Sequence, residues 1–556
     1  MNRKSRYFCV VSIIICALAI YVYPLTLSTP LLDPDEGIHA RIAQEMANSG
    51  DYFVPRLNGK PFRDKPALFS AAQALSLRAF GESESAIRLP GMIFALLGSL
   101  TTVILARRLF DVETSLHTAF ASLTLALPGI LAQSPAHDIA LVPWTNLIVL
   151  AYWEQMHATS ARKRWGYCLA MAFCIALALL TKGLIGVAII AAGLGLYSIV
   201  SRTLSKALIL RCSIALLLGA AIASPWYLLM EHVSPGYLFY YFIDRHVLGY
   251  VTEGQEHGTE PIYYYFGPVL GGSMPWLIFA AAAVLQLRYD VSQRIKQPTL
   301  LLACWFVGGF LFLSAANSKL LTYSLPIFPP IAILAGLGFR RMFHGELADP
   351  VRKLFIANFR VTAFFGVVSP IIALLVLRRF LHAYSPIAAF CFAIVAMSVM
   401  GIEWWQFERR GGRSAPAIGM LWFPIVFVGL MTWPVQPLAE RHSQRALAHM
   451  LNESEVLPDK IVLFGQRVGS VLFYLTPEKR ALCDETRIRE ALITEVPKLV
   501  PPPAGTLVAV TNKELRRSQW KKSLRDLSPR KAGLFNVLTN EADVIHVANQ
   551  PTIKSQ

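Results

Sequence analysis

Long apolar stretches separated by short polar loops dominate residues 1–433 of this chain. About thirteen stretches approach the 20 residues that a helix needs to cross a bilayer. We expect spans at 7–27, 88–106, 114–132, 139–157, 165–181, 184–200, 208–230, 262–285, 299–315, 320–338, 359–378, 385–404 and 415–433. The segment 67–80 is apolar but shorter, which favours a helix in the membrane interface. The pattern predicts an α-helical polytopic membrane protein.

Composition agrees with this pattern. The chain has 556 residues, is 54% hydrophobic and has a mean hydropathy of +0.47, which excludes an ordinary soluble protein. The first apolar stretch is as long as a full span and no small-x-small cleavage site follows it. We therefore expect a retained signal anchor rather than a signal peptide. The eight cysteines show no CxxC spacing, so neither a disulfide framework nor a thiolate metal site is indicated.

Basic residues predict the orientation. They precede the first span and follow every even-numbered span up to the twelfth, with Arg378 and Arg379 as the exception. Because Lys and Arg collect in cytoplasmic loops, the even-numbered loops are expected in the cytoplasm and the odd-numbered loops outside it. This distribution also accounts for the net charge of +17 without nucleic acid as a partner.

Residues 434–556 differ in character from the rest of the chain. Charges are frequent there, and the apolar runs are short. KIVLFG, SVLFYL and GTLVAVT are predicted to be buried strands, and RALAHMLNE and DETRIREALITEV amphipathic helices. The sequence thus predicts a transmembrane domain over 1–433, with a first outer loop at 28–87, and a small α/β domain over 434–556 outside the membrane.

Unusual polar residues gather in the outer loops. Each alone has a structural explanation: a lysine can extend its ammonium to the interface, and an aspartate can cap a helix. Their convergence from at least five loops on one membrane face instead indicates a functional site. The candidates are Asp35, Glu36, Lys65, Asp138, Lys182, Arg245, His246, His257, Glu260 and Lys319.

These residue types suit a lipid phosphate. A phosphate at the membrane surface could be bound by four cations, Lys65, Lys182, Arg245 and Lys319. Asp35 and Asp138 would then act on a sugar or an acceptor. The pattern favours transfer from a lipid phosphate outside the cytoplasm. A transporter would place polar residues near the midplane and show repeat symmetry, which the sequence lacks. A scaffold that kept the fold without activity remains an alternative.

The outer-loop motifs resemble a known family. LDPDEGIHARIAQEMANSGDYFVPRLNGKPFRDKPAL is similar to the first outer loop of the lipid A aminoarabinose transferases and the related protein mannosyltransferases. ALLTKGLIG, SPWYLLMEHVSPGYLFYYFIDRHVLGY, HGTEPIYYYFGPVLGGSMPW and SKLLTYSLPIFPPIAIL continue the resemblance in order, and VLFGQRVGSVLFYL resembles part of the family's periplasmic domain.

The resemblance implies the C-type glycosyltransferase fold, with about thirteen transmembrane helices and a periplasmic tail domain in a bacterial inner membrane. It implies inverting transfer of aminoarabinose from undecaprenyl phosphate to a lipid A phosphate, with membrane lipids as surroundings and the active site facing the periplasm. By position, Asp35 and Asp138 match catalytic acids, and Lys65 and Arg245 match groups at the lipid phosphate. Glu36, Lys182, His257, Glu260 and Lys319 are expected to bind substrate.

The resemblance also suggests a metal-binding site. Asp64 stands where the aminoarabinose transferases have a glutamate, which binds metal there together with a histidine matching His246. Zinc accepts both residue types, so Asp64 and His246 are metal candidates, although two ligands make a weak site. No other cofactor is expected.

Departures from the family pattern leave the sugar and the acceptor open. The family usually has an Arg-Tyr-Ala-Glu run after the Asp-Glu pair, whereas this chain has GIHAR at residues 37–41. The change affects the sugar or acceptor pocket. The alternative is therefore the same fold acting on a hydroxyl acceptor of a protein or another envelope glycan.

Overall fold

The structure, a computed structural model, describes residues 3–248, 260–380, 422–465, 467–515 and 530–539, with a few single residues between 394 and 409. It contains two compact units. The helical unit comprises Met1–Leu27, Arg63–Ala72 and Arg88–Met431, and the sheet unit comprises Ser28–Phe62, Gln73–Ile87 and Thr432–Gln556. The first outer loop thus groups mainly with the C-terminal residues, which differs from the predicted division at residue 433.

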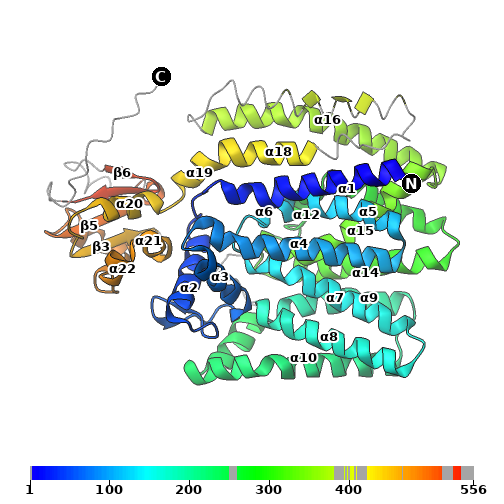
Figure 1. Cartoon of the computed structure of the whole chain (residues 1–556), viewed down its shortest axis with the longest axis horizontal. Coiled ribbons are helices and arrows are strands. Elements are labelled where there is room, and N and C mark those ends of the chain that lie inside the picture. Colours follow the sequence, from blue (N-terminus) through cyan, green and yellow to red (C-terminus); the bar gives the residue numbers. More distant parts are fainter. Residues whose placement is uncertain are drawn as a thin grey trace. The chain divides into compact units, whose positions relative to one another are not determined.

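The helical unit is built almost entirely of helices, and Figure 1 shows α7, α8, α9 and α10 running alongside one another. Its described helices are α1 (Arg3–Ala17), α4 (Glu84–Leu109), α5 (Val112–Thr124), α6 (Ala126–Leu131), α7 (His137–His157), α8 (Ala161–Lys182), α9 (Leu184–Val200), α10 (Lys206–Val233), α12 (Phe266–Ser273), α13 (Leu277–Leu285), α14 (Gln293–Ala315), α15 (Phe328–His344), α16 (Asp349–Phe380) and α18 (Trp422–Leu430).

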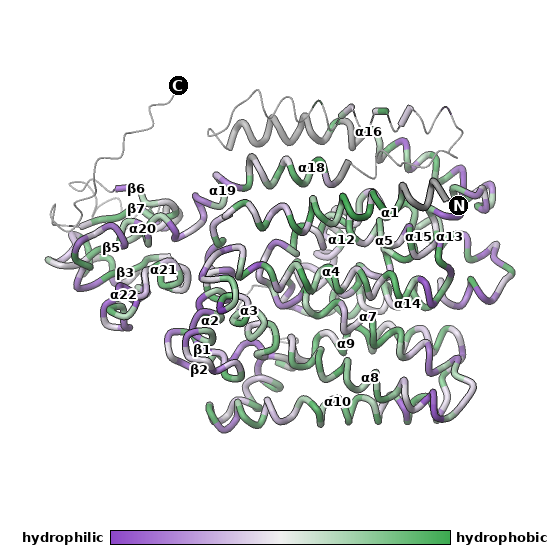
Figure 2. The backbone as a smooth tube through the Cα atoms, in the orientation of Figure 1, coloured by the Kyte–Doolittle hydropathy of each residue, from purple (hydrophilic) through white to green (hydrophobic). Residues whose placement is uncertain are grey.

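Several of these helices can cross a membrane. In the described part of the chain, six helical segments are long and apolar enough: Cys9–Thr26, α4, α8, α10, α14 and Leu321–His344. A seventh arises if α12 and Leu277–Arg288, which meet at a 102° bend, count as one span. Figure 2 shows hydrophobic residues along these helices. A polytopic helical membrane protein is confirmed. The count of thirteen stays a prediction, and the expected span at 385–404 lies outside the described ranges apart from single residues.

Small residues let neighbouring helices approach closely. A Cβ added at Gly193 of α9 would lie 2.6 Å from the Cα of Trp305 in α14, and one at Gly308 of α14 would lie 2.7 Å from the Cα of Gly193. Helices in a bilayer gain little from hydrophobic exclusion, so close packing at small residues stabilises their association. The two predicted spans therefore pack backbone to backbone.

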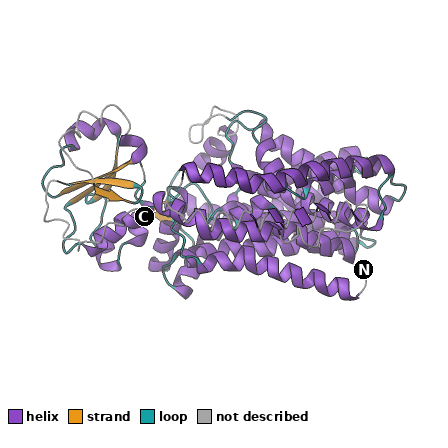
Figure 3. Cartoon of the chain, turned by 90° about the horizontal axis from the view of Figure 1, so that it is seen from above, coloured by secondary structure: helices purple, strands orange, loops and turns teal. Residues whose placement is uncertain are grey.

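The sheet unit contains a five-stranded sheet in the order β4-β3-β5-β7-β6 (Figure 3). The strands are β3 (Lys460–Phe464), β4 (Ile488–Ala491), β5 (Thr506–Thr511), β6 (Arg530–Ala532) and β7 (Phe535–Leu538). β3 pairs in parallel with β4 and β5, and β7 is antiparallel to β5 and β6. Ile461 and Leu463 pack into one apolar cluster and Val462 and Phe464 into another, so the sheet is covered on both faces.

The tail predictions had mixed outcomes. The strands at KIVLFG and GTLVAVT are confirmed by β3 and β5, and the helix at RALAHMLNE by α20 (Arg445–Glu453). SVLFYL is not a strand but lies in helix α21 (Gly469–Tyr474). DETRIREALITEV is not a helix, because its centre forms strand β4. Short helices α22 (Pro477–Ala481) and α23 (Val496–Leu499) complete this part.

The first outer loop has regular structure of its own. It contains helix α2 (Asp35–Ser49), the hairpin of β1 (Arg56–Leu57) and β2 (Lys60–Pro61), and helix α3 (Ala67–Phe80). Asn58 and Gly59 have φ of 53° and 79°, as a tight two-residue hairpin turn requires. The Glu45 carboxylate accepts hydrogen bonds from both of their N–H groups, at 2.7 and 3.0 Å, and so fastens the turn to α2. The helix expected over 67–80 is confirmed by α3.

Candidate functional site

An ion pair joins the start of helix α7 to the end of helix α8. Asp138 lies in the first turn of α7, and Lys182 is the last residue of α8. The following Gly183 has φ 79° and ψ −148°, a conformation that glycine adopts far more readily than other residues, and it separates α8 from α9. Lys182 Nζ donates to Asp138 Oδ1, and both side chains are buried. The same ammonium lies 4.2 Å from the centre of the Tyr323 ring.

A second ion pair joins the first outer loop to helix η3 (Phe239–Leu248). Arg245 donates to Asp64 Oδ1 at 3.0 Å, and the Tyr240 hydroxyl donates to the same oxygen at 2.8 Å. The guanidinium of Arg63 stacks on the Tyr240 ring at 4.5 Å from its centre. Asp64 therefore holds two groups of η3 around one carboxylate oxygen.

Lys65 lies between these two pairs. Burial and, to a lesser extent, the nearby positive charges of Lys182 and Arg245 lower the pKa of Lys65 to about 8, against the opposing charges of Asp64 and Asp138. Three cations and two carboxylates thus interact within the helical unit, although their positions span 64 to 245 in the sequence. With three positive charges and two negative charges, this cluster has a net charge of +1, which suits an anionic ligand.

Two predicted substrate residues, Lys319 and Glu260, lie in other surroundings. The ammonium of Lys319 is buried and donates to the carbonyl oxygens of Glu260, at 2.8 Å, and Ala316. The Glu260 N–H donates to the Asn317 carbonyl at 3.3 Å. These contacts make Lys319 a link between two loop segments, as its structural interpretation allowed. His257 lies outside the described residues.

Asp35 and Glu36 belong to the sheet unit. Asp35 is the first residue of α2 and is exposed, whereas Glu36 is buried. Glu36 Oε2 accepts a hydrogen bond from the Leu32 N–H at 2.9 Å. Acids in the first turn of a helix also favour its positive end. The adjacent acids therefore have a structural use that the sequence did not reveal, and Glu36 has the clearer one.

The metal candidates form no cluster in the described part of the chain, where no group of three His, Cys, Asp or Glu side chains is suited to hold an ion. Asp64 Oδ1 instead accepts hydrogen bonds from the Tyr240 hydroxyl and the Arg245 guanidinium. Because this guanidinium lies 3.0 Å from Oδ1, its positive charge would repel a metal cation at the same oxygen. His246 lies on η3, and its side chain is not among those described. The described donor set does not fit zinc, and no step below uses a metal.

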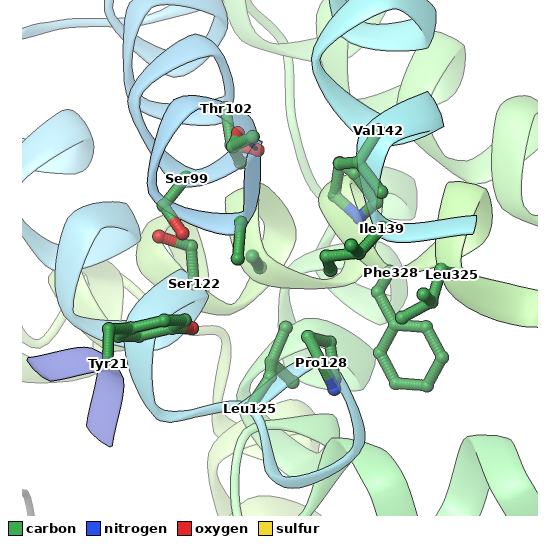
Figure 4. Close-up of a pocket in the computed structure, with 14 residues that line it drawn as sticks. Tyr21, Ser99, Thr102, Ser122, Leu125, Pro128, Ile139, Val142, Leu325 and Phe328 are labelled. Carbon is green, nitrogen blue, oxygen red and sulfur yellow. Dashed lines mark hydrogen bonds between the residues drawn. The ribbon is translucent and has the colours of Figure 1, made fainter. Parts of the chain in front are cut away.

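One small pocket lies in the helical unit. Its volume is about 30 Å³, which is room for about two water molecules. Figure 4 shows Tyr21, Ser99, Thr102 and Ser122 beside the apolar Leu125 on its walls. None of the predicted site residues lines it.

Sequence reasoning missed two aromatic residues in this site. Tyr240 precedes Arg245 by five residues on η3 and hydrogen-bonds Asp64, and Tyr323 follows Lys319 by four residues and lies against Lys182. Arg63 was also overlooked, although it stands next to Asp64 in the sequence. Proximity to charged candidates on the same loop was the available signal for all three.

Comparison with known proteins gives the class first. Over 97% of its length, the chain has the fold of ArnT from Cupriavidus metallidurans, solved bound to undecaprenyl phosphate, with a TM-score of 0.74 and 21% identity over 99% of that chain. The oligosaccharyltransferase of Archaeoglobus fulgidus is more distant, with a TM-score of 0.50 and 14% identity over 86% of this chain and 66% of that one. The chain therefore shares its fold with this ArnT.

Comparison of sequences then gives similar proteins. Residues 64–228 match the family model of dolichyl-phosphate-mannose-protein mannosyltransferases. The chain is 31% identical over 369 residues to an undecaprenyl phosphate-alpha-4-amino-4-deoxy-L-arabinose arabinosyl transferase of Shewanella sediminis, which covers 66% of this chain and 65% of the relative. It is 28% identical over 424 residues to such a transferase of Proteus mirabilis, covering 74% and 73%. The resemblance is confirmed, and the chain is a relative of the aminoarabinose transferases.

Proposed function

We propose that this protein is a membrane glycosyltransferase that moves aminoarabinose from undecaprenyl phosphate to a lipid A phosphate at the periplasmic face of a bacterial inner membrane. The observation that carries the proposal is the cluster of Lys65, Lys182 and Arg245 with Asp64 and Asp138 in the helical unit. The names of the curated relatives and the undecaprenyl phosphate bound to the similar ArnT structure support the same donor.

The chemistry is a single displacement with inversion. An acceptor oxygen forms a bond to the anomeric carbon of the sugar while the bond from that carbon to the phosphate oxygen breaks, and undecaprenyl phosphate leaves as an anion. Lys65 and Arg245 stabilise the charge that develops on the leaving phosphate, an electrostatic contribution that is often the largest in catalysis. Asp138 keeps Lys182 charged and fixed beside this cluster.

The role of Asp35 depends on the acceptor. A lipid A phosphate is already an anion near neutral pH, so Asp35 would orient the acceptor or a sugar hydroxyl. A hydroxyl acceptor must lose a proton, and Asp35 would then serve as the general base. The match of residues 64–228 to protein mannosyltransferases favours this hydroxyl acceptor as the second candidate function.

A transporter or an inactive scaffold would use the same residues differently. Either would bind the lipid phosphate through its cations without releasing a free sugar-acceptor product. Turnover of a donor by the purified protein separates both from an enzyme, because only an enzyme releases undecaprenyl phosphate in proportion to the product formed.

The proposed topology has about thirteen spans, with the first outer loop and the C-terminal α/β residues in the periplasm. Single cysteines at Asn58 and at the native Cys483 should react with an impermeant thiol reagent on intact spheroplasts, in a background where the other cysteines are replaced. Cysteines at Lys163 and Arg410 should react only after lysis. Labelling at Lys163 before lysis, without labelling at Asn58, would contradict the orientation and the proposed site.

Lys65 gives a prediction with a pH signature. Lys65→Ala should lower kcat/KM for the donor by about 10- to 150-fold, since a hydrogen bond to a charged group contributes roughly 1.5–3 kcal/mol. Because the pKa of Lys65 is about 8, its positive charge is present below pH 8 and is lost above it. We expect kcat/KM of the wild type to fall as pH rises through about 8.

Lys65→Arg is the matched variant for this measurement. Arginine stays charged far above pH 8, so this variant should retain most of its activity and lose the alkaline decline near pH 8. Equal kcat/KM for Lys65→Ala and the wild type would show that Lys65 does not bind the donor.

The product is best identified in cells. Mass spectrometry of lipid A, envelope glycans and secreted proteins should be compared with and without expression of this chain. The proposal predicts a mass increase of one aminoarabinose on lipid A that requires expression. An added sugar on a protein or glycan hydroxyl would favour the second candidate, and no added sugar on any fraction would contradict both.

A further inference from the structure

The helix that begins with Asp35 is fastened to the C-terminal residues of the same sheet unit. Asp33, two residues before Asp35, lies at the centre of this attachment. The Ser470 hydroxyl lies 2.7 and 2.6 Å from the two oxygens of the Asp33 carboxylate, to which it donates, and the Gln444 N–H donates to Oδ2 at 3.0 Å. The Asp33 N–H in turn donates to the His442 carbonyl at 3.2 Å.

Backbone packing reinforces these hydrogen bonds. Helix α2 lies against α21, where a Cβ added at Gly37 would be 2.5 Å from the Ser470 Cβ. A Cβ added at Gly469 would be 3.1 Å from the Gly37 carbonyl carbon. No side chain fits at either position without movement, so the two glycines allow α2 and α21 to touch. Gly37 is one of the residues that depart from the family pattern.

Further contacts extend the attachment on both sides of Asp33. The Leu31 N–H donates to the Tyr474 hydroxyl at 2.9 Å. The fully buried Gln44, on the third turn of α2, donates to the Phe473 carbonyl at 3.1 Å. The chain before α2 and the third turn of α2 are thus both tied to residues 442–474. Ser470 itself is fully buried, which protects its hydrogen bonds from water.

Burial has a cost at Asp33 that the hydrogen bonds offset. Burial is the main cause that raises the pKa of Asp33 to about 7, even though the hydrogen bonds from Ser470 and Gln444 oppose this rise. A carboxylate placed in such surroundings is destabilising unless its donors are in place. The Asp33 carboxylate therefore depends on its hydrogen-bond donors, Ser470 and Gln444, which belong to the C-terminal part of the chain.

We infer that Ser470, acting through Asp33, is a positioning residue that fixes the orientation of Asp35. The C-terminal α/β residues thereby form a mount, that is, a surface that holds the start of α2 in place. This inference rests on the proposed role of Asp35. It gives the C-terminal residues an indirect part in sugar transfer, because their hydrogen bonds to Asp33 hold the chain that leads into the first turn of α2.

The test uses the full-length protein in detergent. Ser470→Ala removes the hydroxyl and little else. Hydrogen exchange of peptides covering residues 33–49 should become at least about tenfold faster, and kcat should fall about tenfold, since a hydrogen bond to a charged group is lost. The donor KM should change less than about twofold, because the cations assigned to the donor phosphate lie in the helical unit.

Two further variants complete the design. Ser454→Ala is the matched control, since this buried serine of the same unit donates only to the Met450 carbonyl in the described contacts and should leave kcat unchanged. Gly37→Ala disturbs the attachment from the side of α2 and should cause the same faster exchange and lower kcat. It takes the place of Ser470→Ala in the test if Ser470→Ala does not fold. We expect faster exchange of residues 33–49 and lower kcat in both Ser470→Ala and Gly37→Ala.

Two results would overturn the inference: unchanged exchange at 33–49 in Ser470→Ala and Gly37→Ala, or faster exchange with wild-type kcat. Asp35→Asn, assayed in parallel, separates these from failure of the proposed function. A slow Asp35→Asn with an unaffected Ser470→Ala rejects only the mount. A fully active Asp35→Asn rejects the catalytic role of Asp35 and the mount with it.

Discussion

Replacing Asp35 by asparagine is expected to slow sugar transfer at least about a hundredfold, within the range of 10²–10⁴ typical of a general base or charge-stabilising group. The change is nearly isosteric. Asp35 is exposed at the start of α2, so the helix and its buried face should keep their packing. Donor binding should persist, because the phosphate is assigned to cations of the helical unit. Single-turnover assays with bound donor measure this effect directly.

Glu36→Gln is the control for this variant. Glu36 is buried and accepts a hydrogen bond from the Leu32 N–H, and glutamine keeps an oxygen that can accept the same bond. We expect a smaller loss of activity than for Asp35→Asn. Near-normal turnover of a well-folded Asp35→Asn would make the assignment wrong, and Asp138 would be the next residue to test.

The pH profile of the wild type then distinguishes the acceptors. With a hydroxyl acceptor, activity should fall toward acid pH, because a protonated general base cannot accept a proton. With a phosphate monoester as acceptor, the acid limb should reflect the second ionisation of the phosphate, near pH 6. A profile unaffected by Asp35→Asn would favour the phosphate acceptor.

Removing the positive charge of Lys182 is expected to destabilise the protein strongly. Lys182→Met keeps the length of the side chain but leaves the buried Asp138 carboxylate without its partner. Breaking one side of a buried ion pair typically costs about 3–5 kcal/mol. The apparent unfolding temperature of the purified protein should therefore fall, and donor binding should weaken because one cation of the cluster is gone.

The double variant shows whether the pair is the cause. Lys182→Met combined with Asp138→Asn removes both charges and should recover much of the stability lost in Lys182→Met, without recovering activity. Thermal unfolding of the single and double variants in the same detergent measures this. Equal unfolding temperatures for both would mean that Asp138 is not stabilised by Lys182.

The transmembrane helices were largely predictable because their signal is local. The thickness of the bilayer sets the length of a spanning apolar run at about 20 residues. Helices α4, α8, α10 and α14 follow the expected ranges closely. The bend between α12 and α13 was not foreseen, since hydropathy does not report helix direction. Pro275 lies in this break, where a proline commonly ends or kinks a helix.

Helix α2 was missed because the charges of the first outer loop obscured its period. Ile38, Ile42 and Met46 recur every four residues and are all buried. This spacing is that of one helix face, so a signal was present in the sequence. The tail failed for another reason: the apolar run SVLFYL fits a buried strand or a buried helix equally well, and only packing decides between them.

The candidate site shows the same division between local and distant information. Convergence of charges on one membrane face singled out Lys65, Asp138, Lys182 and Arg245, which the structure brings together, while their roles stay predictions. The partners that fix them, such as Tyr240, are uncharged and could not be found by charge alone. Likewise, no pattern along the sequence connects Asp33 with Ser470, 437 residues away.

Turnover by the purified protein tests the central claim most directly. The full-length chain in nanodiscs is mixed with undecaprenyl phosphate-aminoarabinose and lipid A, and mass spectrometry follows undecaprenyl phosphate and modified lipid A together. We predict equimolar formation of both products by the wild type, and much slower formation of both by Asp35→Asn and Lys65→Ala. Donor that binds but is never consumed, with lipid A or with any hydroxyl acceptor from the envelope, would contradict the account.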